Sequence, residues 1–439
     1  MKPINHKIWG IAGPAILSNI SIPLLGLVDA AILGHLGSTQ YLGAVAIGGA
    51  LLSFLYWGFS FLRMGTTGLV AKAMGARDTQ GASLLLAQSS ILAVVFALAV
   101  IVFHPAWLDM GLGLMAAGGE VSALAESYAS IRISSAPAVL LTYAIVGWFI
   151  GRQDTRWPML IVIATNAINI GLDFLFIVEL QLFSDGAAYA TVIAEYLGCT
   201  LALYGVWRNL PRPVGPGFYR ELKSWAAYQR LLRSNRDLFI RTMCLLFSFA
   251  FFTAMGNKIG SDVLAANALL MQLVLLAAFA MDGFAFAAEA LTGNRLGARD
   301  LPGFYQSVLY CSLWCGLAAL LMSASFWLFH GQLFALMTSI SAVRELLDEY
   351  LPWLILLPLV AAPSYLLDGV FIGSAETRYM MLTMLFSVFL VYLPLWYLSR
   401  SFGNHGLWLA FTVFNGARGI SLYFCYRWLS ARERWLVPG

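Results

Sequence analysis

Residues 147–160, GWFIGRQDTRWPML, and residues 369–382, GVFIGSAETRYMML, are two copies of one pattern. Eight of the fourteen aligned positions are identical without a gap, and the copies lie 222 residues apart. The tetrapeptide GARD recurs at the same offset, at 75–78 and again at 297–300. Two matches at a single offset indicate an internal duplication that covers most of the chain.

The composition places both copies in a membrane. The 439 residues are 60% hydrophobic and only 11% charged, whereas a soluble protein of this length carries far more surface charge. Twelve apolar windows, each of about 20 residues or more, are long enough to cross a bilayer. They lie near 8–35, 43–71, 82–103, 128–151, 157–180, 186–207, 237–257, 263–293, 304–329, 350–373, 379–398 and 405–427. The sequence therefore predicts an all-α integral membrane protein with twelve transmembrane helices.

The duplication and the windows together predict the domain organisation. Each copy holds six windows, and an even number gives both copies the same orientation, so an axis along the membrane normal should relate them. We predict an N-terminal six-helix bundle over 1–207, a basic cytoplasmic linker over 208–236 and a C-terminal six-helix bundle over 237–439. The linker is the one stretch that is polar, basic and rich in Pro and Gly together.

The basic residues predict the orientation in the membrane. Of the 26 lysines and arginines, 20 fall in the predicted inner segments, three in outer loops and three within spans. This distribution places both termini in the cytoplasm. Arg241 is counted with the inner linker, and Arg132, near the outer end of the fourth span, is expected to reach the outer headgroups. The opening MKPINHKIWG lacks a small-residue cleavage site and is interpreted as retained.

The first span carries one full charge, Asp29, within residues 14–36. A carboxylate in hydrocarbon is costly, so such residues usually mark an ion or substrate pathway. Pro14 and Pro23 in the same span favour a bend. At the repeat offset Asp29 corresponds to Phe251, which argues against a general packing role. The alternative is that Asp29 lies near the helix end and reaches water.

Spans five and six each present a polar face, since the residues recur at helical spacing. These residues are Asn166, Asn169, Asp173, Ala187, Thr191 and Glu195. Amide, carboxylate and hydroxyl oxygens can hold a hard cation such as Na⁺, and close carboxylates can share a proton. A hydrogen-bonded packing network between helices is the other interpretation, and it explains Asp173 poorly because a buried charge is expensive.

The C-terminal half has acids of its own. Asp282 and Glu289 stand two turns apart on the eighth span, and Asp368 lies on the tenth. They can form a second cation or proton site, line a cleft and select positively charged substrates, or support helix packing.

Several functional classes find no support in the sequence. It contains no Walker A pattern, no HExxH and no serine-triad context, so we expect a protein that is not an enzyme and uses no cofactor. The five cysteines lie in apolar runs without zinc-ligand spacing. The basic residues follow the sidedness of a membrane, so no nucleic-acid partner is expected. Energy must come from an ion gradient or from a partner.

Four stretches resemble the multidrug and toxic compound extrusion (MATE) transporters, most closely their DinF-like branch. They are GPAILSNISIPLLGLVDAAILGHLGS near the start, RMGTTGLVAKAMGARD, NIGLD followed by DGAAYATVIAEY, and LLDGVFIG. The resemblance implies a V-shaped pair of six-helix bundles around a central cleft. It also implies a monomer in the bacterial inner membrane that exports small amphipathic or cationic compounds, with membrane lipid around it.

The resemblance also implies roles for single residues. Asp29 matches the central coupling residue and Pro14 the proline at which the first helix is proposed to bend. The remaining matches to the coupling or cation site are Asn169, Asp173, Thr191, the carbonyl of Ala187 and Tyr128. A Na⁺ ion would be held by Asp29, Asn169, Asp173 and Thr191. Another branch uses a seventh-span Glu, but this chain has no acid in the corresponding stretch, FAFFTAMGNKIG.

We therefore predict a drug/H⁺ antiporter that works by alternating access. In this scheme protonation of the Asp29 cluster drives bending of the first helix. A Na⁺-coupled antiporter and a flippase for lipid-linked precursors remain alternatives. The major facilitator fold also has six plus six spans, but AKAMGARDTQG does not match its GxxxDRxGRR-like loop.

Overall fold

The computed structural model describes residues 2–34, 39–114, 119–210 and 217–436. Within these ranges every regular element is a helix. The elements are α1 (Lys2–Gly34), α2 (Thr39–Gly58), α3 (Phe61–Gly75), α4 (Thr79–Leu114), α5 (Gly119–Ile133), α6 (Ala136–Gly151), α7 (Arg156–Asp173), η1 (Phe174–Glu179), α8 (Phe183–Asn209), α9 (Phe218–Leu222), α10 (Trp225–Ile259), α11 (Ser261–Gly297), α12 (Leu301–Met337), α13 (Ser341–Gly373), α14 (Thr377–Phe386), η2 (Ser387–Tyr392), α15 (Leu393–Ser399), η3 (Arg400–Phe402), α16 (Gly403–Ala431) and η4 (Arg434–Leu436).

The predicted spans lie on these helices. Over the described residues, nine helical segments are long and apolar enough to cross a membrane, or ten when a bent pair counts as one span. The bent pair is α5 and α6, which meet at 52°. One segment, Thr377–Ala431, contains two of the predicted spans, and α1 carries the first predicted span. The prediction of an all-α membrane protein is confirmed.

The chain divides into two compact units. Unit 1 comprises Met1–Ile16, Ala71–Arg77 and Arg233–Gly439, and unit 2 comprises Leu17–Val70 and Asp78–Leu232. The division therefore falls inside α1, α3 and α10. The domain boundaries at 207 and 237 stay a prediction.

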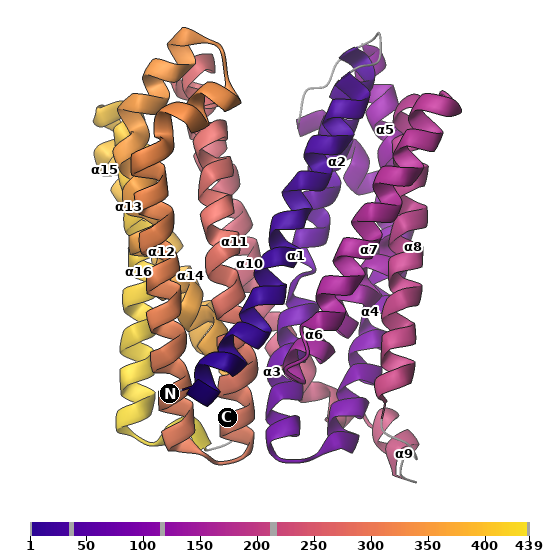
Figure 1. Cartoon of the computed structure of the whole chain (residues 1–439), viewed down its shortest axis with the longest axis vertical. Helices are drawn as coiled ribbons and strands as arrows, with labels where there is room; N and C mark the ends of the chain where they lie inside the picture. Colours follow the sequence, from indigo (N-terminus) through magenta and orange to yellow (C-terminus); the bar gives the residue numbers. More distant parts are fainter. Residues whose placement is uncertain (1, 35–38, 115–118, 211–216, 437–439) are drawn as a thin grey trace. The chain divides into compact units, whose positions relative to one another are not determined.

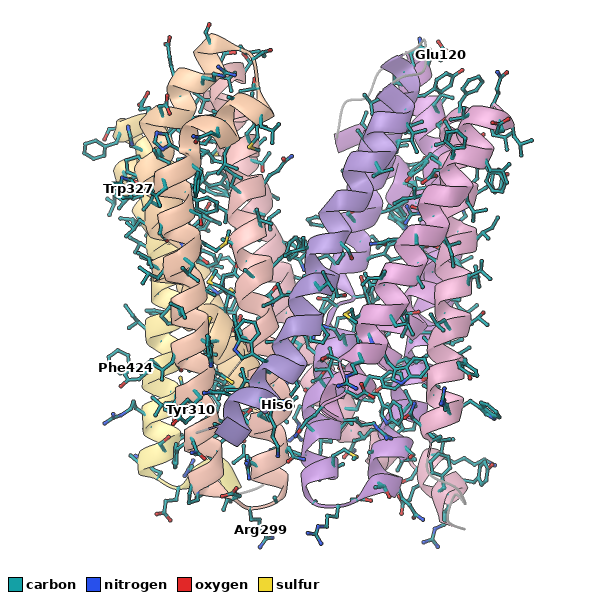
Figure 2. All side chains as sticks on the ribbon, in the orientation of Figure 1. His6, Glu120, Arg299, Tyr310, Trp327 and Phe424 are labelled. Carbon is teal, nitrogen blue, oxygen red and sulfur yellow. The ribbon has the colours of Figure 1, made fainter. Side chains whose placement is uncertain are left out.

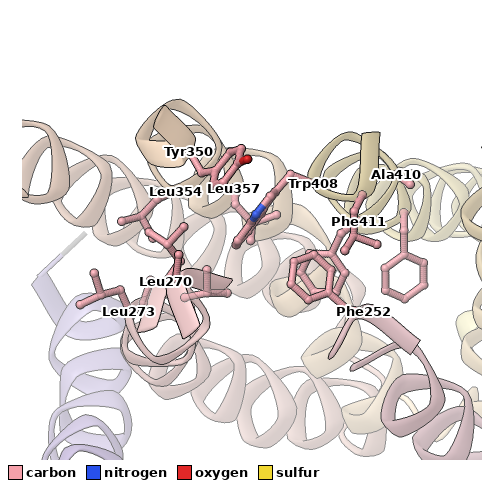
Figure 3. Packing of buried hydrophobic residues seen from close by; sticks show 14 of the residues in the cluster. Phe252, Leu270, Leu273, Tyr350, Leu354, Leu357, Trp408, Ala410 and Phe411 are labelled. Carbon is pink, nitrogen blue, oxygen red and sulfur yellow. The ribbon is translucent and has the colours of Figure 1, made fainter. Parts of the chain in front are cut away.

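Unit 1 is built around α13. This helix packs against α11, α12 and α16, which run alongside it in Figure 1. Its core brings together Phe252 of α10, Leu270 of α11, Leu354 of α13 and Trp408 of α16, as Figure 3 shows. All four side chains are at most 2% exposed. Aromatic rings dominate this core because each buries a large area in well-defined geometry.

Unit 2 is built from helix pairs. In Figure 1, α7 lies along α8, and the structure also pairs α2 with α5 and α4 with α6. Trp148 of α6 is fully buried and its indole N–H donates to the carbonyl of Ala82, 3.1 Å away. That bond satisfies the one polar group of the largest side chain in this part of the core.

The outward-facing side chains of unit 1 are apolar. Figure 2 shows Trp327 and Phe424 pointing away from the bundle, and they are 62% and 67% exposed. Exposed apolar side chains of this size over the length of several helices mark a surface that contacts something other than water. This surface fits the hydrocarbon of a membrane.

The duplication extends to backbone conformation. Arg77 and Arg299 follow the ends of α3 and α11 and have φ of 60° and 56°, the left-handed conformation common after a helix C-terminus. The next residues, Asp78 and Asp300, accept hydrogen bonds from the backbone N–H groups of Gly81 and Gly303, at 2.7 and 2.9 Å. Carboxylates at helix starts satisfy donors that lack helical partners. The GARD repeat is therefore a helix–turn–helix joint used twice.

Equivalent glycines also make equivalent close contacts. A Cβ atom at Gly147 of α6 would meet the carbonyl oxygen of Arg63, and one at Gly369 of α13 would meet that of Ala285. Both pairs stand 222 residues apart. The four contacting residues lie on α3 and α6 in unit 2 and on α11 and α13 in unit 1, so each repeat keeps one helix crossing with the backbones touching.

A reciprocal contact occurs inside unit 1. A Cβ at Gly75 would meet the carbonyl oxygen of Asn294, and a Cβ at Gly297 would meet that of Lys72. The repeat offset converts one contact into the other. The ends of α3 and α11 therefore pack on each other with local two-fold symmetry.

Several predicted loops are helical. The segment 104–127 was predicted as an outer loop, but α4 continues to Leu114 and α5 begins at Gly119. The linker 208–236 contains α9 and the first twelve residues of α10, which begins at Trp225. Hydropathy locates the apolar part of a helix, and a helix continues past it wherever the sequence lacks a strong terminator.

One count from the sequence is wrong. Arg241 was placed with the cations of the inner linker, but it lies within α10 and is only 7% exposed. It donates to Asp368 of α13. The carboxylate compensates the cost of burying the guanidinium.

Candidate functional site

The polar faces predicted for spans five and six meet in unit 2. The amide Nδ2 of Asn169 on α7 donates to the Thr191 hydroxyl on α8 at 3.2 Å, and that hydroxyl donates to the carbonyl of Ala187 at 2.9 Å. Asn169, Thr191 and Ala187 are 1%, 9% and 3% exposed. We call this chain of polar atoms, together with Asp173, the oxygen cluster.

Asp173 is the acid of the oxygen cluster. It lies one turn after Asn169 on α7 and its side chain is fully buried. It is the last residue of α7, and the π-helix η1 starts at the next position. A π-turn adds a residue to the helical turn and is frequent at functional sites. Here it changes the direction of the side chains that follow the acid.

The oxygen cluster leaves acceptor capacity for a small cation or a proton. The Oδ1 atom of Asn169 is buried and accepts no hydrogen bond from any described residue. The Thr191 hydroxyl spends its hydrogen on Ala187 and one lone pair on Asn169, so a second lone pair remains. With the Asp173 carboxylate these oxygens suit Na⁺ as well as H⁺. Among the described residues no three His, Cys, Asp or Glu side chains gather as a metal site.

Asn166 points to α1 rather than into the cluster. Its Nδ2 donates to the backbone carbonyl and the hydroxyl of Ser21, at 3.1 and 3.2 Å. The start of α1 is held separately within unit 1, where Trp9 packs edge-on against Trp314 with ring centroids 5.1 Å apart. Pro14 lies on α1 between these two attachments, and α1 is helical through it.

Two predicted residues cannot be placed fully. Asp29 falls on α1, but its side chain lies outside those that the structure describes, and the same holds for Pro23. Their assigned roles stay predictions.

The structure corrects the roles expected for Arg132 and Tyr128. Arg132 does not extend to the headgroups; it donates to Glu195 of α8 at 3.0 Å and to the Tyr128 hydroxyl at 3.2 Å. Tyr128, which is 4% exposed, therefore accepts a bond from a cation. The side chains of Arg132 and Glu195 are 14% and 18% exposed. Burial makes each charge the best available partner of the other.

A signal for this pair is present in the sequence. Arg132 is the one full charge in the window 128–151, and Glu195 is the one full charge in 186–207. Single charges of opposite sign on two spans of one bundle are expected to pair. The same argument applies to Asp368 in 350–373 and Arg418 of α16.

The acids of the C-terminal half have different surroundings. Glu289 is buried at 2% exposure and Asp282 is half-buried, both on α11. Asp368 accepts from Arg418 at 2.8 Å and also from Arg241. A cation that bound to Asp368 would have to displace two guanidinium groups.

The family model named MatE matches residues 14–175 and 238–398. The chain belongs to the MatE family. The two matched segments are the two halves of the duplication, and together they include α7 with Asn169 and Asp173. MatE membership makes the chain a multi-pass membrane transporter rather than an enzyme.

Curated members of the family are similar over most of the chain. The DNA damage-inducible protein F of Escherichia coli is 39% identical over 429 residues, which cover 96% of this chain and 92% of the relative. The multidrug and toxin extrusion protein 1 of Danio rerio is 27% identical over 300 or so aligned positions, 313 in all, covering 68% of this chain and 51% of the relative. The resemblance to MATE transporters is thus confirmed.

Solved structures share the fold. A structure described as MATE in the bent conformation has a TM-score of 0.88 at 21% identity, covering 99% of this chain and 97% of the other. A transporter of the MOP superfamily from Pyrococcus furiosus gives 0.89 at 21% identity, covering 99% and 96%. The arrangement of the helices is therefore that of MATE structures.

Proposed function

We propose that this MatE-family transporter exports small amphipathic or cationic compounds in exchange for H⁺. The oxygen cluster carries the proposal, because it places a fully buried carboxylate, Asp173, beside an amide and a hydroxyl with free acceptor capacity. Intramembrane acids of this kind usually belong to an ion pathway. The printed names of relatives as multidrug and toxin extrusion proteins support the substrate class.

The proposed cycle uses the change in charge at the cluster. With Asp29 and Asp173 deprotonated or sharing a proton, the protein binds a lipophilic cation. Protonation from outside removes negative charge, and the substrate is released. The separate attachments of α1 at Trp9 and at Ser21 leave Pro14 as the point at which α1 can bend between them. The proton leaves to the cytoplasm when access alternates.

The remaining parts of the proposal follow the same scheme. The protein works as a monomer in the bacterial inner membrane, with both termini in the cytoplasm. Membrane lipid surrounds it, and neither a cofactor nor a nucleic acid takes part. Na⁺ in place of H⁺ is the alternative that the same oxygens accommodate.

Proteoliposomes test the coupling directly. Ethidium-type cationic dyes added to vesicles holding the protein should release protons into a pH-sensitive dye, with and without Na⁺. Asp29→Asn and Asp173→Asn should abolish the proton signal, whereas Asp109→Asn, which removes an exposed acid from α4 of the same unit, should keep it. Full proton-coupled transport by Asp29→Asn would contradict the scheme. A response that requires Na⁺ and ignores a pH gradient would replace H⁺ by Na⁺.

A further inference from the structure

Two arginines in unit 1 share one carboxylate oxygen. Arg418 of α16 donates to Oδ2 of Asp368 at 2.8 Å, and Arg241 of α10 donates to the same atom. Arg418 is 2% exposed and Arg241 is 7% exposed. Asp368 thus contacts two buried cations, which already rules it out as an open cation ligand.

Both guanidinium groups keep a donor that nothing in the described chain accepts. The Nε atoms of Arg241 and Arg418 are buried and have no hydrogen-bond partner among the described residues. The other end of Arg418 donates to Asn415 at 3.1 Å. A buried donor on a charged group is costly to leave unpaired, so an acceptor brought by a ligand would gain most of that cost back.

A cavity with about 350 Å³ of empty space lies against this cluster. Its polar wall is formed by Arg418, Asn415 and Tyr365. The rest of the lining is apolar and aromatic, with Phe249, Leu357 and Phe411 among its members. The volume is at the lower end of the range for sites that bind small organic molecules.

We propose that this cavity binds an amphipathic organic anion whose carboxylate or sulfonate accepts hydrogen bonds from Arg418. Cations are disfavoured because the charged wall is a guanidinium and the one carboxylate beside it is doubly paired. An inorganic ion is disfavoured because most of the lining is apolar and would gain nothing from it. The site is independent of the proposed proton coupling, since it concerns equilibrium binding in unit 1.

Asp282 of α11 sets the charge balance of the site. Tyr365 interacts electrostatically with Asp282 as well as with Asp368, Arg241 and Arg418. The two acids therefore offset the two arginines. Removing the charge of Asp282 leaves an excess of positive charge near the cavity, which should strengthen the binding of an anion.

Thermal unfolding of the purified full chain tests the proposal with octanoate as the probe. A ligand that binds only the folded state raises the melting temperature in a saturable manner. Octanoate should do so, whereas octylammonium, with the same chain length and the opposite charge, and chloride should not. Arg418→Gln should weaken the apparent Kd for octanoate at least about tenfold, and Asp282→Asn should tighten it.

A second variant decides the question if Arg418→Gln does not fold. Ala361→Leu adds volume to the cavity wall and keeps every charge, so it should abolish the octanoate effect. Arg344→Gln removes a cation from the start of α13, outside the cavity lining, and should bind octanoate as the wild type does. Equal stabilisation by octylammonium, a full effect from chloride alone, or unchanged binding in Ala361→Leu would overturn the proposal.

Discussion

At the scale of single residues, Thr191 connects the two helices of the oxygen cluster. Its hydroxyl accepts from Asn169 and donates to the carbonyl of Ala187. The group therefore fixes which oxygens of the cluster remain available. Valine has the same shape without the hydroxyl, so Thr191→Val isolates this contribution.

We expect Thr191→Val to slow drug-driven proton exchange about tenfold, because it removes hydrogen bonds worth about 1 kcal/mol each. The measurement is proton release from proteoliposomes, as for the acids. Thr200→Val is the matched control, since Thr200 is an exposed residue of the same helix and bonds only to the carbonyl of Tyr196 among the described contacts. Equal effects of the two substitutions would remove Thr191 from the site.

A second residue-scale prediction concerns Glu376, which lies between α13 and α14. Burial raises the pKa of its carboxyl above the ordinary 4.5, and Lys72 partly opposes this shift. Between 4.5 and the folded-state pKa, the folded chain binds more protons than the unfolded chain. Stability therefore falls as the pH rises through this window.

We expect Glu376→Gln to lack this decline, so the variant should gain in melting temperature over the wild type as the pH is raised above 4.5. Melting curves across the pH range measure the difference. Glu345→Gln, which changes an exposed acid of α13, should follow the wild type. A gain by Glu376→Gln that is the same at every pH would show that its charge is not responsible.

At the scale of elements, the glycines of the repeat hold helix crossings at backbone contact. We expect Gly147→Ala and Gly369→Ala each to destabilise the fold by about 1–3 kcal/mol, since the new Cβ would overlap a carbonyl oxygen. Gly171→Ala in α7 is the control, because a Cβ there meets nothing within 4 Å. Chemical or thermal unfolding in detergent measures all three. Wild-type stability in both repeat variants would mean that the crossings relax.

Sequence patterns predicted helices better than they predicted partners. The repeat and the apolar windows predicted the helical spans, because hydropathy and internal similarity depend on many residues at once. The polar faces of α7 and α8 were also predicted, from helical spacing. The partners of Arg132 and Arg241 were missed, because a span alone does not tell which neighbour it packs against. The π-helices η1 and η2 have no sequence signal that we can identify.

At the scale of the whole molecule, the basic residues predict that the loops after α3 and α11 are cytoplasmic. We expect a cysteine introduced by Arg299→Cys to react with a membrane-impermeant maleimide only after the cells are permeabilised. Lys258→Cys should react in intact cells. Both positions are exposed. The background should carry Cys425→Ser, because the other four native cysteines are buried. The reverse pattern of labelling would invert the orientation.

The reciprocal contact between the ends of α3 and α11 has the form of an isologous interface, in which one surface patch meets its own copy. Gly75 faces Asn294 as Gly297 faces Lys72. Before the duplication, a single six-helix chain with one such glycine satisfied the same geometry by pairing with a second copy of itself. In that ancestor every substitution at the contact acted twice. Fusion separated the two copies, so each half became free to acquire its own charges, acids on α7 in one and paired arginines around Asp368 in the other.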